Sequence, residues 1–264
     1  MEEIIDSPVI EAYPGAQTVA RAIALLRALD DSHPERGLSE LSEHVGLNKT
    51  TTHRLLSALE AEGLIMRGSA AGQYRLGVEL IALGGCAMRA NELREVSRPE
   101  LDLLMRESGE NAVIEIMVKR RVMILDEVSS QTLQAAPLDI GVRLPLHATS
   151  TGKLLLAYRP PEEIEAILAE PLPALTPRTI VEPELLRAQL DEIRARGYAK
   201  ADGELDVGFV AVAAPVYNAD RVVVAAVSVG GPSLRLTEER LPGIVALVQV
   251  AGRRISRRLG YRPI

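Results

Sequence analysis

One segment of the sequence combines hydrogen-bonding and basic side chains at helical spacing. Asn48 is a good N-cap for a helix that runs to about Glu62. The inward face of this helix is formed by Thr52, Leu55, Leu56 and Leu59. The outward face carries Thr50, Thr51, Arg54 and Ser57, with Asn48 and Lys49 at the tip. Threonine hydroxyls, an arginine that can fork onto guanine and a helix N-terminus are groups that read a DNA major groove, so the pattern predicts a recognition helix.

A second helix N-terminus is expected at the segment TSTGK, residues 149–153. The segment lacks the first glycine of a phosphate-binding loop and the Ser or Thr that should follow its lysine. Instead, Ser150 and Thr151 supply hydroxyls, and the amides near Gly152 and Lys153 are expected to point toward an anion such as a small carboxylate. A capped helix that binds nothing is the alternative, and the residues alone leave it open.

Three helices and a hairpin are expected around the first segment. Residues 17–29 repeat apolar side chains at i, i+3, i+4 and i+7, which is typical of an amphipathic helix. Ser39 is expected to cap a short second helix that runs through Val45, and residues 64–67 and 73–76 favour a hairpin. Two short helices with a tight turn, a helix before them and a hairpin after them predict a winged helix-turn-helix.

This arrangement places nine polar or basic residues where they can contact DNA. They are Ser39, Asn48, Lys49, Thr50, Thr51, His53, Arg54, Arg67 and Arg75. His53 fits a surface or rim histidine better than a metal ligand, because no second histidine stands at ligand spacing. The alternatives are a polar face that contacts only solvent and a winged helix that binds protein.

The charge of the chain argues against recognition of DNA by overall electrostatics. The net charge is −6, and residues 1–80 carry 7 Lys or Arg against 12 Asp or Glu. Residues 49–76 are locally basic, with 4 Lys or Arg against 2 Glu. Nucleic-acid binders identified by charge are basic, so DNA binding here must rest on local geometry. A winged-helix interaction scaffold that does not bind DNA therefore stays open.

The composition excludes several classes of protein. With 264 residues, 47% hydrophobic and 25% charged, the chain fits two globular domains at about 150 residues each. Cys86 is the only cysteine, which excludes a disulfide framework, a cysteine zinc site and a two-thiol redox centre. With 6 Tyr, 1 Phe and no Trp, aromatic platforms for single-stranded nucleic acid are not expected.

No catalytic residue, metal or cofactor is expected. The 4 histidines do not cluster, and Cys86 lies far from any of them that could act as its base. A small-molecule enzyme is kept only as an alternative. The chain opens without a basic leader, and no apolar run approaches the roughly 18 residues that span a membrane. We therefore expect a cytoplasmic protein without a membrane partner.

The periodicity changes along the chain and predicts three parts. They are a DNA-binding domain at residues 1–76, a helical connector at residues 77–108 with a break at Pro99, and a second domain at residues 109–264. Strands are expected at residues 112–118, 121–128, 133–137, 209–216 and 222–229. Helices are expected at residues 151–158, 161–169 and 183–196, and a last helix from Thr237.

Together these segments resemble a known family. Residues 19–29, GLSELSEHVGLNKTTTHRLLSALEAEGLIMR (37–67) and QYRLGVELIALG (73–84) closely resemble the winged helix of the IclR family of bacterial transcriptional regulators. The likeness continues in LPLHATSTGKLLLA (144–157), GYAKADGELDVGFVAVAAPVYNADRVVVAAVSVGGP (197–232) and SLRLT (233–237). It implies an α+β protein: an N-terminal winged helix-turn-helix joined by a helical connector to a C-terminal GAF-like α/β domain that binds an effector.

The resemblance also implies a pocket and its ligand class. The effector would be a small organic or aromatic acid, and the positions carried over are Ser150, Thr151, Gly152, Lys153, Asp202, Ala211, Ser228 and Gly230. Asp202 and Glu204 both fall near the acidic position of the family. Ala211 stands where some members have cysteine, and Gly230 replaces a second serine, which makes a more apolar pocket. His147 is expected to be buried and hydrogen-bonded rather than catalytic.

The implied partners are double-stranded promoter DNA and further copies of the chain. A single winged helix with a small local charge offers few phosphate contacts, so two half-sites are needed for useful affinity. We therefore expect a homodimer or homotetramer on a pseudo-palindromic operator.

Overall fold

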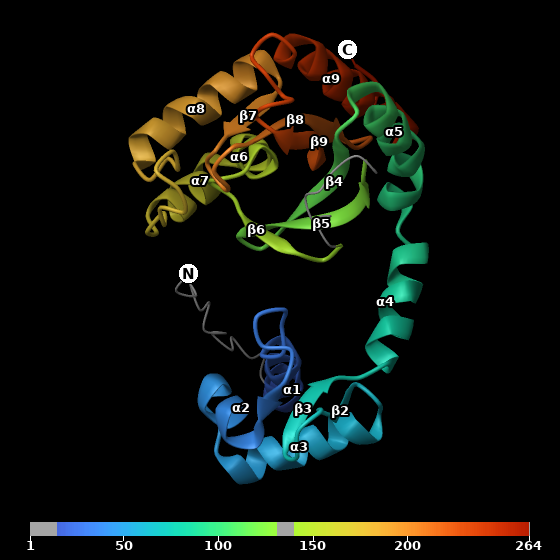
Figure 1. Ribbon diagram of the computed structural model, residues 1–264, viewed down its shortest axis with the longest axis vertical. Helices are drawn as coiled ribbons and strands as arrows, with labels where there is room; N and C mark the ends of the chain where they lie inside the picture. The colour runs from blue at the N-terminus through green and yellow to red at the C-terminus, as the bar shows by residue number, and fades with distance from the viewer. Residues whose placement is uncertain (1–14, 131–139, 264) are drawn as a thin grey trace. The chain divides into compact units, whose positions relative to one another are not determined.

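The computed structural model describes residues 15–130 and 140–263 (Figure 1). The chain divides after Ala90 into two compact units. The two helices of the expected connector fall in different units, because one ends at Arg89 and the next begins at Glu92.

The first unit is a small helical core with a three-stranded sheet. Its elements are α1 (Gln17–Arg27), β1 (Arg36–Gly37), α2 (Leu38–Val45), α3 (Lys49–Ala61), β2 (Ile65–Arg67), β3 (Gln73–Leu76) and α4 (Glu79–Arg89). The strands are antiparallel in the order β1-β3-β2. Leu25, Leu41 and Leu56 are fully buried and join the first three helices in one core. The predicted winged helix-turn-helix is confirmed, with β1 as an addition too short to show periodicity.

The predicted cap of α2 is wrong by two residues. Gly37 is the N-cap, and its N–H donates to Glu40 Oε2 at 2.6 Å. Ser39 therefore lies within the first turn, with an exposed side chain. The physical reason is the pairing of Gly37 with Gln73 in β3, which fixes the end of β1 and so the start of the helix.

The second unit begins with α5 (Glu92–Ser108), and the predicted break at Pro99 is wrong. Pro99 lies inside α5, whereas Asn91 caps this helix by accepting a hydrogen bond from the Arg94 N–H at 3.0 Å. Leu101 and Leu104 follow Pro99 and are buried against the sheet. Their burial holds the helix together across the hydrogen bond that proline cannot make.

An antiparallel six-stranded sheet forms the centre of this unit. Its strands are β4 (Asn111–Val118), β5 (Arg121–Val128), β6 (Arg143–Pro145), β7 (Ala199–Asp202), β8 (Phe209–Tyr217) and β9 (Val223–Pro232). They lie in the order β6-β5-β4-β9-β8-β7, so the long central strands β4 and β9 are neighbours. The expected strand at residues 133–137 lies outside the described residues.

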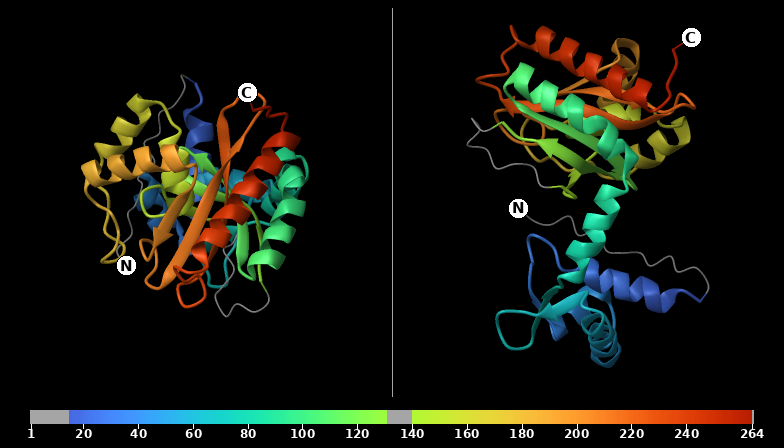
Figure 2. Two further views of the ribbon diagram at one scale, coloured as in Figure 1. Left: turned by 90° about the horizontal axis from the view of Figure 1, so that it is seen from above. Right: turned by 90° about the vertical axis from the view of Figure 1, so that its right-hand side faces the viewer.

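Helices cover both faces of the sheet (Figures 1 and 2). On one face α5 packs beside α9 (Leu241–Arg258). On the other face lie α6 (Ser150–Ala157), α7 (Pro161–Leu168) and α8 (Pro183–Arg196). This is the predicted α/β domain, and its central strands and three of its helices match expectation within two or three residues.

The last helix begins later than predicted. Thr237 accepts from the Arg240 and Leu241 N–H groups in a turn, and α9 starts only at Leu241. Pro242 explains the difference, because a proline fits only the first turn of a helix, where no N–H is needed. The short strands β6 and β7 were not predicted, since three or four residues carry too little alternation to be recognised.

Candidate nucleic-acid interface and ligand pocket

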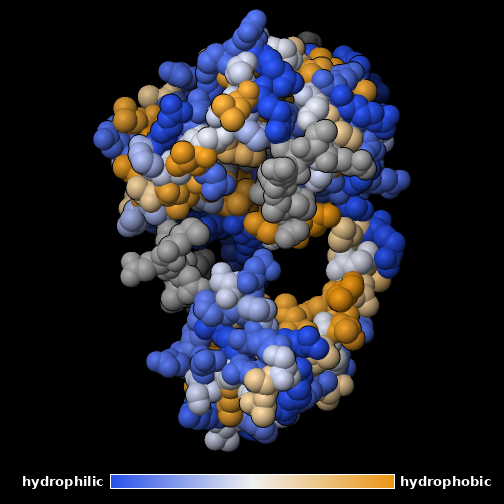
Figure 3. All heavy atoms as spheres, in the orientation of Figure 1, coloured by the Kyte–Doolittle hydropathy of each residue, from blue (hydrophilic) through white to orange (hydrophobic). Residues whose placement is uncertain are grey.

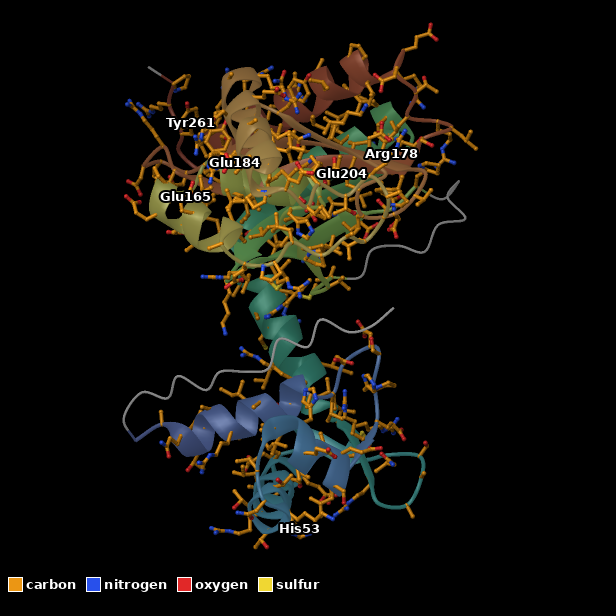
Figure 4. All side chains as sticks on the ribbon, turned by 90° about the vertical axis from the view of Figure 1, so that its left-hand side faces the viewer. His53, Glu165, Arg178, Glu184, Glu204 and Tyr261 are labelled. Atoms are coloured by element: carbon orange, nitrogen blue, oxygen red, sulfur yellow. The ribbon has the colours of Figure 1, made fainter. Side chains whose placement is uncertain are left out.

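The recognition helix has the geometry that its sequence predicts. Asn48 caps α3, and its Oδ1 accepts from the Thr51 N–H at 2.8 Å. Buried on the inner face are Thr52, Leu56 and Leu59, whereas Leu55 is half-buried. Thr51 is half-buried, and His53 on the outer face is labelled in Figure 4. The exposed residues of this face are Lys49, Thr50, His53, Arg54 and Ser57. A continuous polar surface is thus available on one side of α3.

The two hairpin arginines differ in how free they are. Arg67 donates to both carboxylate oxygens of Glu60, at 2.8 and 3.0 Å, and stacks over the Tyr74 ring at 4.5 Å. The Arg75 side chain is exposed and forms no hydrogen bond or close ion pair with another described side chain, although its charge acts on Glu35. A phosphate contact would therefore have to compete with Glu60 for Arg67, but not for Arg75.

A pocket of about 280 Å³ lies in the second unit between the sheet and the start of α6. Five predicted effector-binding residues line it: Ser150, Thr151, Ala211, Ser228 and Gly230. Gly152, Lys153 and Asp202 do not. Acidic residues that line the pocket are Glu115, Glu204 and Asp206, and its apolar walls include Val113, Leu205 and Phe209.

The hydrogen bonds of α6 correct the predicted anion contacts. Thr149 is the N-cap, and its Oγ1 accepts from the Gly152 N–H at 3.0 Å. The Lys153 N–H donates to the Thr149 carbonyl, also at 3.0 Å. These two amides are therefore already used within the helix. The amides of Ser150 and Thr151 make no hydrogen bond with any described residue, and both residues line the pocket.

Lys153 forms a buried ion pair instead of facing a ligand. Its Nζ lies 2.6 and 2.7 Å from the two carboxylate oxygens of Glu204 and 2.9 Å from Gln189 Oε1. The side chain of Lys153 is fully buried, and this burial lowers the pKa of its ammonium group against the opposing attraction of Glu204. The lysine charge is thus balanced within the protein.

Asp202 is directed elsewhere. It pairs with Arg178 at 2.6 Å and with Lys200 at 3.2 Å, outside the pocket. The acids of this loop that line the pocket are Glu204, labelled with Arg178 in Figure 4, and Asp206. Sequence spacing alone could not separate Asp202 from Glu204, because β7 ends at Asp202 and strand alternation does not continue beyond it. The direction of the chain at Glu204 depends on the turn at Gly203, which has a positive φ.

Glu115 is one of the pocket residues that the sequence did not predict. It lies at a β-bulge in β4 and is 3% exposed. Ser228 Oγ donates to its carboxylate at 3.1 Å, and the nearby Thr151 side chain also favours the ionised carboxylate. Burial raises the pKa of the Glu115 carboxyl to about 7, against the opposing effects of Thr151 and Ser228. The available signal was a single carboxylate inside the otherwise apolar run AVIEIMV.

His147 lies outside the pocket lining and has a structural role. His147 is buried, and its Nε2 lies 2.9 Å from the Pro173 carbonyl oxygen, as predicted. Burial lowers the pKa of this imidazole and favours the neutral form. Among the described residues no group of three potential metal ligands occurs, and no helix there has the length and hydrophobicity to cross a membrane.

A winged helix-turn-helix in one chain with an α/β unit that encloses a pocket defines a DNA-binding protein that responds to a small ligand. Residues 18–68 match the IclR helix-turn-helix domain, and residues 86–257 match the domain described as bacterial transcriptional regulator IclR C-terminal. The chain belongs to the IclR family of bacterial transcriptional regulators. It is a DNA-binding regulator with an effector-binding C-terminal domain.

Similar proteins extend over almost the whole chain. The glycerol operon regulatory protein of Streptomyces coelicolor is 37% identical over 246 residues, 92% of this chain and 96% of that protein. The HTH-type transcriptional repressor AllR of Klebsiella pneumoniae is 35% identical over 255 residues, 96% of this chain and 93% of that protein. A crystal structure of an IclR homolog from Microbacterium hydrocarbonoxydans, complexed with 4-hydroxybenzoate, is 28% identical with a TM-score of 0.78 and covers 92% of this chain and 98% of that chain.

Proposed function

We propose that this regulator reads operator DNA through the outer face of α3 and changes its DNA affinity when a small organic or aromatic acid binds in the pocket. The observation that carries the acid proposal is the start of α6, where the amides of Ser150 and Thr151 face a pocket with apolar walls. Helix N-terminal amides bind carboxylates. The related structure complexed with 4-hydroxybenzoate supports this ligand class. Because its target is promoter DNA, we place the protein in the cytoplasm.

A ligand screen coupled to DNA binding tests this function. Short-chain and aromatic acids are screened by thermal shift, and each acid that stabilises the protein is added to a gel-shift titration on the promoter fragment. An effector must shift DNA affinity, and DNA must reciprocally shift acid affinity. Acids that bind without changing DNA affinity would contradict the regulatory role. Absence of promoter binding even at low salt would favour an interaction scaffold.

Arg54→Ala is expected to weaken operator binding by about 1–3 kcal/mol and to relax base preference at one position of each half-site. Arg54 is exposed on the outer face of α3 and carries no ion pair among the described residues, so folding is not affected. Gel-shift titration against the operator and a scrambled site measures both effects. Arg27→Ala in α1 is the control, since it removes an exposed arginine outside α3. Equal loss in both variants would contradict the assignment of the recognition helix.

We propose a homodimer, alone or within a tetramer, in which α4 forms part of the contact between chains. No residue of α4 is buried. Its large apolar side chains are exposed to solvent: Ile81 is 76% and Leu83 52% exposed, and Val78 just before the helix is 67% exposed. Figure 3 shows apolar side chains gathered over this helix. Apolar surface of this extent on one helix is typical of a protein contact.

Ile81→Glu is therefore expected to shift the protein toward monomer and to weaken operator binding. The reason is that a charge in an apolar contact is desolvated without a partner. Light scattering over a concentration series measures the mass of the assembly. Glu79→Gln, on the same helix, removes a charge rather than adding one and serves as control. A fully dimeric Ile81→Glu variant would exclude this side of α4 from the interface.

A further inference from the structure

The charges around the pocket are unusual for a protein that binds acids. Among the described residues that line it, none is a lysine, arginine or histidine, whereas three are acids: Glu115, Glu204 and Asp206. Lys153 lies on the same helix as Ser150 and Thr151, but Glu204 already pairs with it through two contacts below 2.8 Å. An incoming carboxylate therefore meets hydrogen-bond donors but no free positive charge on the described part of the pocket.

Glu115 lies where such a carboxylate would bind. Thr151 and Glu115 both line the pocket, the Thr151 side chain acts on the Glu115 carboxyl, and the Thr151 amide is one of the two free amides at the start of α6. An acid seated on these amides would therefore occupy the pocket that Glu115 also lines. Two ionised carboxylates this close, both taken out of water, repel strongly. One proton between them converts the repulsion into a hydrogen bond.

The other groups around Glu115 do not relieve this repulsion. Glu127 on the neighbouring strand β5 adds a second negative charge to its surroundings. From β9 comes the uncharged hydroxyl of Ser228, and β8 contributes only Ala211 and Phe209 to the pocket. Glu204 and Asp206 add negative charge from the loop after β7, with Glu204 balanced by Lys153.

We propose that Glu115 is an effector-binding residue that holds a proton in the complex and donates it in a hydrogen bond to the carboxylate of the effector, so that the pocket takes up an organic acid together with one proton. The inference rests on the proposed acid effector and adds the residue that selects for it. Because burial already raises the pKa of Glu115 to about 7 in the free protein, the carboxyl binds this proton far more readily than an exposed glutamate does. The pocket thus favours monocarboxylates with a neutral remainder, since a second charge would find no partner.

The sign of the pH dependence follows from linkage. A proton taken up on binding makes the affinity highest where free Glu115 is already protonated, below about pH 7. Above that pH the affinity falls by up to tenfold per pH unit, because each complex must first recruit its proton. Ordinary carboxylic acid ligands stay ionised through this range, so the proton belongs to the protein.

Isothermal titration calorimetry on the full-length protein tests the proposal. The probes are 4-hydroxybenzoate, benzoate, pyruvate and glycerate, each with its primary amide as neutral counterpart. Titrations run from pH 5.5 to 8.5, each in two buffers of different ionisation heat, which counts the protons bound. For the best acid we expect uptake of close to one proton at pH 8 and a Kd that is roughly fifteenfold weaker at pH 8.5 than at pH 7. The amides should bind with the same affinity at each pH.

The variant Glu115→Gln tests whether the proton is bound by Glu115 or by the carboxyl group of the ligand. The glutamine NH₂ donates a hydrogen bond at every pH, so this variant should bind the acid without proton uptake and with a Kd that no longer changes with pH. Glu162→Gln on α7 makes the same chemical change at an exposed site and should keep the wild-type pH profile. If Glu115→Gln does not fold, the proton count of the wild-type protein decides alone.

The outcomes distinguish this inference from the function on which it rests. Acid binding that changes DNA affinity but takes up no proton overturns the role of Glu115 and leaves the acid-responsive regulator intact. A panel in which no acid binds from pH 5.5 upward overturns the acid effector and, with it, the inference. A Glu115→Gln variant that keeps the wild-type pH profile assigns the proton to another group and overturns the proposal.

Discussion

Lys153→Met will destabilise the effector-binding domain by about 3–5 kcal/mol at pH 8. The substitution keeps the aliphatic length of the side chain but removes the ammonium group that both Glu204 oxygens contact. The Glu204 side chain is only 8% exposed, so its charge stays buried without a partner. Denaturant unfolding, followed by circular dichroism, gives the change in the free energy of unfolding.

The pH profile and two controls identify the cause. An orphaned Glu204 binds a proton more readily when folded than when unfolded, so the destabilisation should be largest above pH 7 and shrink toward pH 5. Lys153→Met combined with Glu204→Leu removes both charges and should recover much of the loss. Arg187→Met breaks the exposed pair with Glu165 and should change stability far less. If Lys153→Met alone were as stable as wild type at pH 8, the result would show that the ion pair between Lys153 and Glu204 is not buried.

Gly152→Ala is expected to cost about 3 kcal/mol or more and to abolish acid binding. A Cβ at this position would lie 2.3 Å from the Leu146 carbonyl oxygen and 2.5 Å from Thr149 Oγ1. Leu146 and Thr149 both belong to the segment that leads into α6. The Leu146 carbonyl oxygen is part of the backbone, so a change of side-chain rotamer cannot move it away. The helix must therefore shift away from Thr149, which displaces the free amides of Ser150 and Thr151.

Thermal unfolding with and without the best acid measures both losses. Gly243→Ala in α9 is the matched control, because its Cβ would meet no atom within 4 Å. Alanine is the better helix former by up to about 1 kcal/mol, so the control should be neutral or slightly more stable. Gly152→Ala with wild-type stability and acid affinity would contradict the close approach of Leu146 to α6.

The sequence by itself determined the local elements that position the recognition surface. The cap at Asn48, the inward stripe Thr52, Leu56 and Leu59, and the hairpin of β2 and β3 each depend on residues within one turn or one short loop. Periodicity and capping express such short-range preferences directly, so the outer face of α3 followed without the fold. The segment SVGG likewise placed Ser228 and Gly230 in the pocket, but through resemblance to the family rather than through physics.

The tertiary structure alone decided the electrostatics of the pocket. Glu115 and Ser228 are 113 positions apart, and Lys153 and Glu204 are 51 apart, yet each pair meets because β4 lies beside β9 and α6 packs against the same sheet. Which carboxylate is paired, which is buried and which faces the ligand depends on desolvation and on partners from distant strands. Spacing along the chain carries neither quantity. It therefore predicted the Lys153 amide as an anion contact, and the family resemblance gave Asp202, whereas Glu115, Glu204 and Thr151 are the residues that line the pocket.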